Sequence, residues 1–573
     1  MRVSFFKVFT VLAIATILVR LFFVQVLEHD MWVEKAYGKQ VKTFDLPARR
    51  GEIYARDGGE IVPLVMNREV WTVILDPKMV KDEKGVEEVL LRVAPERIVA
   101  KFEDAWADKE RRYFVIARGV AREEIEEIKA AKLSGVGQVK TTARVYPEGE
   151  LASRLLGFVN MDGKGQYGVE GAMNGRLSGV NGLLRTVTDI NMIPITIGSE
   201  NIKEPVRDGE NVVLTVDKGV QWGAEKIIAE ARVENGADYV GAVVLNSKNG
   251  EVVAMAGVPN YSPEEYFRVA DGRRFNNPVV DGPYEPASVI KSLTFATGLD
   301  VNAITPETTY VNTGSTTVDD RVIKNMLQEV FGEISMQTAI NNSFNTGSVE
   351  VLRRLDGGQI TKRGRTVLYD YLTEHFGLGS KTGIELYEVT GTVISPEKTE
   401  GNAVRYANMT FGQGMTATMM QVASGFTSVV NGGEYFKPTV VAGTMEGGRF
   451  VPVDDERVAA RRTISSETSA TMRKMLEGTR EGRKRNGSDP VGYAIGGKSG
   501  TAEVAGADGR YKTDEAIASY VGFVGGEDSE YVVMVRIEGA GKRYQGAYQA
   551  EPIFTKIMQF LVGYLGMKPL SGQ

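Results

Sequence analysis

The chain has 573 residues, enough for two to four domains, and its 42% apolar and 25% charged content is typical of a folded protein. A net charge of −6 offers no basic surface for nucleic acid. Cysteine is absent, and His29 and His375 are the only histidines. This composition argues against disulfides, against thiolate or histidine metal sites, and against a serine hydrolase with an imidazole base.

The N-terminus contains a predicted membrane anchor. Residues 8–27 are mostly apolar with a single charge, Arg20, and a helix of about 20 such residues spans the core of a bilayer. Arg2 and Lys7 precede this run, whereas Glu28 and Asp30 follow it. The positive-inside rule therefore places the N-terminus in the cytoplasm and everything after residue 30 outside. We expect residues 1–30 to form a cytoplasmic tip and a single-pass anchor.

Two features of this segment leave alternatives. Ala13-Ile14-Ala15 is similar to the cleavage site of a signal peptide, but the apolar run continues well past it, which favours an uncleaved anchor. Arg20 either snorkels to the outer interface or faces another membrane helix.

Residues 31–205 are predicted to form an extended, loop-rich region. Segments 49–64 and 144–159 have the character of strands with turns, marked by Asp57-Gly58-Gly59 and Pro147-Glu148-Gly149. Between them, apolar residues at helical spacing within 121–137 predict a helix that stops at Gly135 and has a solvated charged face. None of these segments carries a catalytic pattern.

From about residue 206 the chain is richer in apolar strands. Segments 211–217 and 239–261 have this character, and Lys248-Asn249-Gly250 is a hairpin turn signal. Helical stretches follow, and 531–539 is another strand. Strands at both ends with helices between them predict an α+β domain over 206–573, whose sheet is closed by the C-terminal strand.

Ser288 and Lys291 form an S-x-x-K pattern at a predicted helix start. Pro286 precedes the serine and helical spacing follows it, so the two side chains share a helix face and Lys291 can reach the Ser288 hydroxyl. A lysine acts as a base only if burial or a second cation lowers its pKa far below about 10.4. The alternative is ordinary polar residues at a helix start.

Lys498-Ser499-Gly500-Thr501 supplies the second cation. On a strand, Lys498 and Gly500 would point to one face, and Ser499 and Thr501 to the other. Gly500 would let a ligand backbone come close. The alternative is a glycine-rich bend with a solvated lysine.

Ser343 and Asn345 place a hydroxyl and an amide on alternate positions. A loop could direct both into a pocket, where they would relay protons and hold a peptide group. The alternative is a helix N-cap, where Ser and Asn are preferred.

Taken together, S-x-x-K, S-x-N and K-S-G-T in this order resemble the penicillin-binding proteins, specifically the monofunctional transpeptidases of class B. Segment 49–61 is similar to the R-G-x-I-x-D-R-x-G element of the family's non-catalytic pedestal, with Ala55 in place of Asp. Further segments resemble later pedestal elements and the transpeptidase domain: 144–159, 167–182, 214–221 and 411–433. The resemblance runs from the anchor to about residue 560. Ala287 replaces the usual Gly, and Ser499 a Thr.

The resemblance implies a role for each residue of the three motifs. Ser288 would attack the penultimate D-Ala of a peptidoglycan stem peptide and expel the terminal D-Ala. Lys291, kept neutral by burial and by Lys498, would take the hydroxyl proton. Ser343 would pass the proton to the leaving amine, and Asn345 would bind the donor peptide and orient Lys291.

The resemblance also implies how substrate is held. Backbone N–H groups of Ser288 and Thr501 would form the oxyanion hole. The strand with Ser499, Gly500 and Thr501 would pair with the substrate backbone and bind its carboxylate. A neighbouring amine would then take the acyl group, and penicillins would acylate the same serine. Such acyl transfer needs no metal and no organic cofactor.

The family's architecture is α+β: one N-terminal transmembrane helix, an extended β-rich pedestal, and a transpeptidase domain with a central antiparallel sheet flanked by helices. We place these parts at 1–30, 31–205 and 206–573. The implied location is the bacterial cytoplasmic membrane. The implied partners are stem peptides, β-lactams as covalent inhibitors, a SEDS-family (FtsW/RodA-like) glycosyltransferase in the membrane and other divisome proteins. Arg20 and the helix faces over residues 12–26 could contact the glycosyltransferase.

Three alternative functions fit the sequence less well than a transpeptidase. A β-lactamase would need a deacylating loop that we cannot assign, and a β-lactam sensor would need a larger membrane apparatus. A non-enzymatic cell-wall scaffold would not need three intact motifs. Within class B, the short pedestal, the K-S-G-T form and the lack of an appended C-terminal module resemble the FtsI-like division type more than the elongation type.

Overall fold

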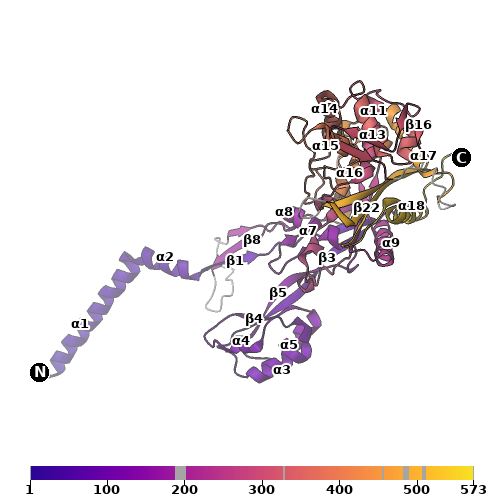
Figure 1. The fold of residues 1–573 in the computed structure, drawn as a ribbon. Coiled ribbons are helices and arrows are strands. Elements are labelled where there is room, and N and C mark those ends of the chain that lie inside the picture. The colour runs from indigo at the N-terminus through magenta and orange to yellow at the C-terminus, as the bar shows by residue number, and fades with distance from the viewer. Residues whose placement is uncertain are drawn as a thin grey trace. The chain divides into compact units, whose positions relative to one another are not determined.

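The structure is a computed structural model that describes residues 2–187, 202–326, 330–453, 457–481, 489–505 and 511–571. Its contacts divide the chain into two compact units, one made of Met1–Gly51 with Ser178–Glu210 and the other of Glu52–Leu177 with Asn211–Gln573. Both units contain helices and strands (Figure 1). The predicted α+β class, with one apolar N-terminal helix and a central sheet near the C-terminus, is confirmed.

The first unit contains the predicted anchor. Phe5–Leu27 is a 23-residue helical segment with a mean hydropathy of 2.3 and exposed side chains, and in the described ranges it is the one helix that could span a membrane. This unit also contains an antiparallel sheet with the strand order β1-β8-β9. The elements are α1 (Arg2–Phe22), η1 (Phe23–Leu27), α2 (His29–Gln40), β1 (Val41–Leu46), β8 (Gly182–Val187) and β9 (Ile202–Glu204).

The second unit contains two large sheets. The first has the order β19-β18-β10-β2-β3-β4, and β5 also pairs with β3. Its strands are β2 (Ile53–Asp57), β3 (Glu60–Leu75), β4 (Phe114–Val120), β5 (Val136–Val145), β10 (Val212–Asp217), β18 (Val441–Glu446) and β19 (Arg449–Pro452). The strand predicted at 211–217 is β10, which lies between β2, to which it is parallel, and β18, to which it is antiparallel. Both partners come from distant parts of the chain.

Helices α3 (Glu83–Val93), α4 (Phe102–Trp106) and α5 (Arg122–Ala130) pack on one end of this sheet. The helix predicted within 121–137 is α5, and Ile125 and Ile128 are buried on its inner face, as the spacing predicted. The helix is shorter than expected, because the chain enters β5 directly after the turn at Gly135.

The central antiparallel sheet has the order β12-β11-β23-β22-β21. Its strands are β11 (Tyr239–Asn246), β12 (Val252–Val258), β21 (Ala494–Ala505), β22 (Tyr511–Gly525) and β23 (Glu530–Glu538). As predicted, residues 248–250 turn between β11 and β12, and the C-terminal strand β23 pairs with β11. Val243 and Leu245 face one core and Ala242 and Val244 the other, so both faces are covered and the strands are continuously apolar.

Two layers of helices cover the central sheet. Helices α9 (Lys218–Asn235) and α18 (Glu551–Tyr564) pack on one face, and α11 (Lys291–Asp300), α16 (Met419–Val430) and α17 (Ser466–Glu481) on the other. Figure 1 shows α9 below β22 and α18 beside it, with α11 and α16 above. The second layer also contains α10 (Pro278–Asp281), α12 (Met336–Asn341), α13 (Asn345–Arg354), α14 (Lys362–Asp370) and α15 (Ala403–Met409).

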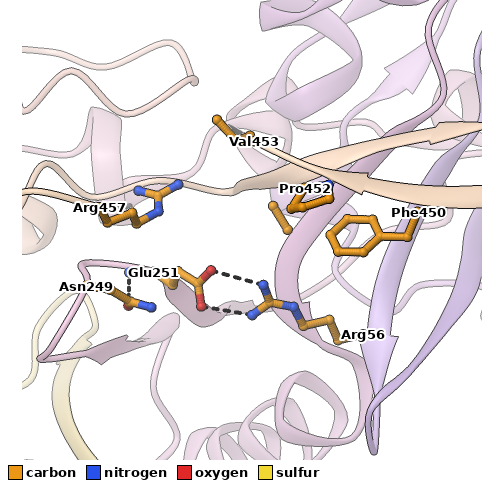
Figure 2. Close-up of a pocket in the computed structure, with 8 residues that line it drawn as sticks. Arg56, Asn249, Glu251, Phe450, Pro452, Val453 and Arg457 are labelled. Carbon is orange, nitrogen blue, oxygen red and sulfur yellow. Dashed lines mark hydrogen bonds and ion pairs between the residues drawn. The ribbon is translucent and has the colours of Figure 1, made fainter. Parts of the chain in front are cut away.

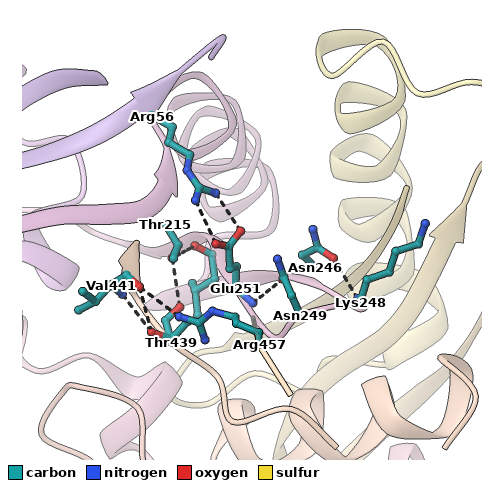
Figure 3. A network of polar contacts seen from close by, with 10 residues as sticks. Arg56, Thr215, Asn246, Lys248, Asn249, Glu251, Thr439, Val441 and Arg457 are labelled. Carbon is teal, nitrogen blue, oxygen red and sulfur yellow. Dashed lines mark hydrogen bonds and ion pairs between the residues drawn. The ribbon is translucent and has the colours of Figure 1, made fainter. Parts of the chain in front are cut away.

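An ion pair joins the two sheets of this unit. Arg56 of β2 donates two hydrogen bonds to Glu251, 2.8 and 3.0 Å long, at the turn before β12 (Figure 3). Burial alone would raise the pKa of Glu251, but Arg56 holds that pKa below its usual value. Thr215 of β10 donates to the carbonyls of Val252 and Thr439, 2.7 and 3.1 Å away, which ties β10 of the first sheet to β12 of the second.

A 530 Å³ pocket opens beside this ion pair (Figure 2). Arg56, Glu251 and Asn249 line one side and Arg457 another, with Phe450 among the apolar residues. None of the predicted site residues lines it. The predicted residues Lys498 and Thr501 lie instead on β21, at the edge of the central sheet.

Candidate active site

Ser288 lies in a turn that leads into the central helix of the domain. The turn η5 (Ala287–Ile290) is a single turn of 3-10 helix that continues into α11. Ser288 is half-buried, whereas Lys291, one turn later, has no exposed surface. The helix start that the proline and the apolar spacing predicted is therefore present.

The residue before Ser288 has an unusual backbone conformation. Ala287 has φ = +53°, in the left-handed region that favours glycine. Its N–H donates to the carbonyl of Gly412 over 3.1 Å, and a Cβ on Gly412 would lie 2.2 Å from the Ala287 carbonyl oxygen. The two backbones are thus pressed together, and this contact holds the strained turn in place.

Lys291 directs its amine away from the surface into a set of polar partners. Its Nζ lies 2.8 Å from Asn345 Oδ1 and 3.2 Å from Ser343 Oγ, and it also hydrogen-bonds the Ser343 carbonyl. Among the described residues, no hydrogen bond joins Lys291 to the Ser288 hydroxyl. Burial lowers the pKa of Lys291 well below the usual value of a lysine, which favours the neutral amine that a base requires.

Ser343 lies in the turn between α12 and α13, with φ = +56°. Its Oγ is 2.9 Å from Lys498 Nζ and 3.2 Å from Lys291 Nζ, so one hydroxyl bridges the two amines. The N-cap of α13 is Phe344, without a side-chain cap, so capping does not explain Ser343 or Asn345. The structure brings these residues together with both lysines.

The partners of Lys291 suit two protonation states. An ammonium group has three N–H donors, and the Asn345 oxygen, the Ser343 carbonyl and the Ser343 hydroxyl can accept them. A neutral amine has two N–H donors and one lone pair, to which the Ser343 hydroxyl can donate instead. The same cage therefore lets Lys291 take up and return a proton without losing hydrogen bonds.

Lys498 and Thr501 lie on β21, which is the edge strand of the central sheet. Lys498 and Gly500 are buried, and Ser499 and Thr501 are half-buried, in the alternation expected of a strand. The Thr501 hydroxyl accepts the backbone N–H of Gly546 over 3.1 Å. One side of β21 carries no partner strand in the described chain, and such an edge is where an extended peptide can add to a sheet.

Gly500 differs from the sequence interpretation. It was expected to admit a ligand backbone, but a Cβ there would lie 2.6 Å from Ser519 Oγ and 2.9 Å from the Pro286 carbonyl oxygen. The space beside Gly500 is therefore filled by the turn that carries Ser288. The glycine allows β21 and this turn to approach each other.

Glu285 is a residue of the site that the sequence interpretation missed. Its carboxylate accepts the N–H of Gly414 and the hydroxyl of Tyr511, each over 2.9 Å, so it joins three segments around the turn. Burial raises the pKa of Glu285. The sequence holds one signal for this contact. The paired glycines around Gln413 indicate a tight turn, and Gly414 of that turn is a partner of Glu285.

His375 has a structural role. Its ring stacks on Tyr371, with centroids 4.1 Å apart, and Nδ1 lies 2.6 Å from the Thr463 carbonyl oxygen. In the described ranges, no group of three or more His, Cys, Asp or Glu side chains could hold a metal ion.

Two family profiles match the sequence. The penicillin binding protein transpeptidase domain matches residues 240–559, and the penicillin-binding protein dimerisation domain matches residues 45–214. The first of these profiles covers more than half of the chain and includes every predicted site residue.

Individual proteins resemble the chain over nearly its whole length. Stage V sporulation protein D of Bacillus subtilis is 30% identical over 579 residues, covering 100% of this chain and 87% of its own. Peptidoglycan D,D-transpeptidase FtsI of Escherichia coli is 26% identical over 572 residues, covering 97% and 91%. Penicillin binding protein 3 of Mycobacterium tuberculosis, solved in complex with aztreonam, has the same fold, with a TM-score of 0.67 and 22% identity over 92% of this chain and 98% of that one.

The contact between Gly412 and Ala287 predicts opposite effects of two substitutions. Gly412→Ala forces a methyl group against the Ala287 carbonyl and is expected to cost about 1–3 kcal/mol of unfolding free energy. Ala287→Gly removes the cost of about 1–2 kcal/mol of holding an alanine in the left-handed conformation. It also stabilises the unfolded chain by about 0.4–1 kcal/mol through added conformational entropy, so the free energy of unfolding should stay equal or rise slightly. Urea denaturation of the two variants measures both.

Gly163→Ala is the control, because Gly163 has φ = +75°, close to the +77° of Gly412, but a Cβ there would meet nothing within 4 Å. Equal stability of Gly412→Ala and Gly163→Ala would contradict the assigned contact.

Proposed function

The chain belongs to the class B penicillin-binding proteins, the penicillin-sensitive serine D,D-transpeptidases of peptidoglycan synthesis, and we propose that it uses Ser288 to cross-link stem peptides at the division septum. The observation that carries the assignment of Ser288 is the buried pair of amines bridged by the Ser343 hydroxyl, since one of the two, Lys291, lies one turn after Ser288.

In the acylation step, Ser288 Oγ bonds to the carbonyl carbon of the penultimate D-Ala, and its proton passes to the neutral amine of Lys291. The peptide bond to the terminal D-Ala breaks, and the leaving amine receives that proton through the Ser343 hydroxyl. General acid–base transfer of this kind contributes about 10²–10⁴-fold to rate. Asn345 keeps Lys291 in line for both transfers and binds the donor peptide.

Lys498 is the cation that keeps this relay directed. Its ammonium donates to Ser343 Oγ and to the Ser499 carbonyl, 3.2 Å away, so the Ser343 proton is left to face Lys291. The negative charge on the reacting oxygen is bound by the N–H groups of Ser288 and Thr501, and each such donor is worth about 10²–10³ in kcat. Ser499 and Thr501 offer hydroxyls to the substrate carboxylate, and Gly500 keeps the strand close to the turn.

The second half of the reaction regenerates the enzyme. The amine of an acceptor stem peptide attacks the Ser288 ester, a new peptide bond forms, and the Ser288 oxygen regains a proton from Lys291. A β-lactam enters the first half only, because its ring-opened amine stays attached. The M. tuberculosis relative solved with aztreonam supports β-lactams as covalent inhibitors of this chain.

The rest of the chain delivers this domain to the wall. We assign residues 1–30 to the anchor, 31–205 to a non-catalytic pedestal and 206–573 to the transpeptidase domain. One N-terminal apolar helix fits a single-pass membrane protein. The charges that flank it support an N-terminus in the cytoplasm and a catalytic domain outside. The exposed apolar faces of this helix suit contact with a SEDS-type glycosyltransferase of the membrane, and other divisome proteins would complete the complex.

Fluorescent penicillin is expected to label the full-length chain and not Ser288→Ala. Lys291→Ala should slow labelling by about 10²-fold or more, since the base is lost. Ser292→Ala is the matched control, because Ser292 lies on the same helix but donates to the Val289 carbonyl. Gel fluorescence over time measures both rates. Labelling of Ser288→Ala would contradict the assignment, and loss of label within minutes would indicate a hydrolase.

The septal role predicts a specific phenotype. Depletion of the protein in its host should give filaments without septa, rescued by the wild-type gene and not by Ser288→Ala. Replacement of residues 1–30 by an unrelated transmembrane helix should also fail to rescue, at equal protein level, because the glycosyltransferase contact is lost. Rounded, widening cells would contradict the septal role and indicate elongation, and normal growth of the chimera would exclude the anchor contact.

A further inference from the structure

The carboxamide of Asn345 is held from both sides. Its oxygen accepts from Lys291 over 2.8 Å, and its nitrogen donates to the carbonyl of Lys324 over 2.9 Å. Lys324 is the last residue of β15 (Arg321–Lys324), which forms a hairpin with β14 (Ser315–Val318). The hairpin carbonyl thus decides which end of the carboxamide faces Lys291, since a rotated amide would lose both hydrogen bonds.

The next residue, Asn325, fixes the hairpin to the start of α13. Its side chain is 5% exposed, and its Oδ1 accepts the Thr346 N–H over 3.0 Å. Its Nδ2 donates to Asn312 Oδ1 over 3.0 Å and to Thr346 Oγ1 over 3.2 Å. Its own N–H donates to the Gly314 carbonyl over 2.9 Å. The Lys324 carbonyl belongs to the peptide bond between Lys324 and Asn325. Asn325 therefore links this carbonyl to Thr346, the residue after Asn345.

Asn312 completes the support from the other side. Its side chain is 1% exposed, and its Oδ1 accepts from Gly314 N–H and Thr346 Oγ1, 3.1 and 3.0 Å away. Tyr310 OH lies 3.0 Å from the same threonine hydroxyl. Buried amides with satisfied hydrogen bonds hold a backbone in one arrangement, because leaving any partner unpaired is costly.

We propose that Asn325 is a positioning residue for catalysis, which sets the Lys324 carbonyl and through it the orientation of the Asn345 carboxamide toward Lys291. The proposal rests on the proposed function, in which Lys291 is the base and Asn345 orients it. Asn325 touches neither the substrate nor the reacting atoms.

The groups around Lys291 make its protonation sensitive to this orientation. Lys498 faces it from β21 through Ser343, Asn345 faces it from α13, and the Phe411 ring lies 5.9 Å from its Nζ. The Asn345 oxygen accepts from Lys291 and so favours the ammonium form. Loss of this acceptor lowers the pKa of Lys291 further and at the same time leaves the amine poorly aimed.

The test is the rate of acylation by a fluorescent penicillin as a function of pH, on the full-length protein in detergent. Asn325→Ala is expected to lower the maximal rate about 10–100-fold, as small misplacements of catalytic groups do, and to move the acid limb of the profile to lower pH. Asn345→Ala should show the same two changes. Asn277→Ala is the matched control, because this buried amide caps α10, and it should leave both the rate and the limb unchanged.

The outcomes separate the two claims. If Asn345→Ala leaves the profile unchanged, the proposed role of Asn345 is wrong and the inference falls with it. If Asn345→Ala changes the profile and Asn325→Ala behaves like Asn277→Ala, the inference alone is overturned. Should Asn325→Ala fail to fold, Asn325→Asp applies the same test. The aspartate still accepts the Thr346 N–H, but it can donate to Asn312 only while its carboxyl group is protonated. A rate–pH profile of Asn325→Asp identical to wild type would overturn the proposal.

Discussion

The buried amine of Lys291 is the constraint on which the rest of the site depends. It lies at the start of α11, a helix whose residues from Lys291 to Leu299 are all buried between the central sheet and the surrounding helices. A charged ammonium there would be costly, so burial lowers its pKa and favours the neutral form. The apolar packing of the domain, rather than any single polar contact, is therefore what favours the neutral amine that the proposed role of Lys291 requires.

The groups around this amine come from three distant parts of the sequence, and positive φ values or close backbone contacts mark each place where they meet. Ala287 and Ser343 both have positive φ, and Gly500 is the glycine against which the Ser288 turn packs. Such strain persists only where surrounding contacts over-determine the backbone. Gly412 and Glu285 supply those contacts at the Ser288 turn, as Asn325 does at the start of α13.

Local sequence patterns predicted many of the helices, strands and turns, and they also predicted which residues gather around Lys291. The helix start at Ser288, the alternation along β21, the hairpin before β12 and the apolar N-terminal helix follow from spacing, turn residues and hydropathy. Long-range contacts did not follow, because periodicity within a segment does not reveal its neighbours. The place of β10, the neighbours of Gly500 and the left-handed Ala287 all belong to that class.

The most direct test of this account is the titration of Lys291 itself. Nuclear magnetic resonance of lysine side chains labelled with ¹³C and ¹⁵N, with Lys291→Arg to assign the signal, follows its amine in the intact site. The account predicts that Lys291 loses its proton well below the surface lysines, because its amine is fully buried. Titration of Lys291 together with the surface lysines would contradict the account, since a charged amine could not accept the Ser288 proton.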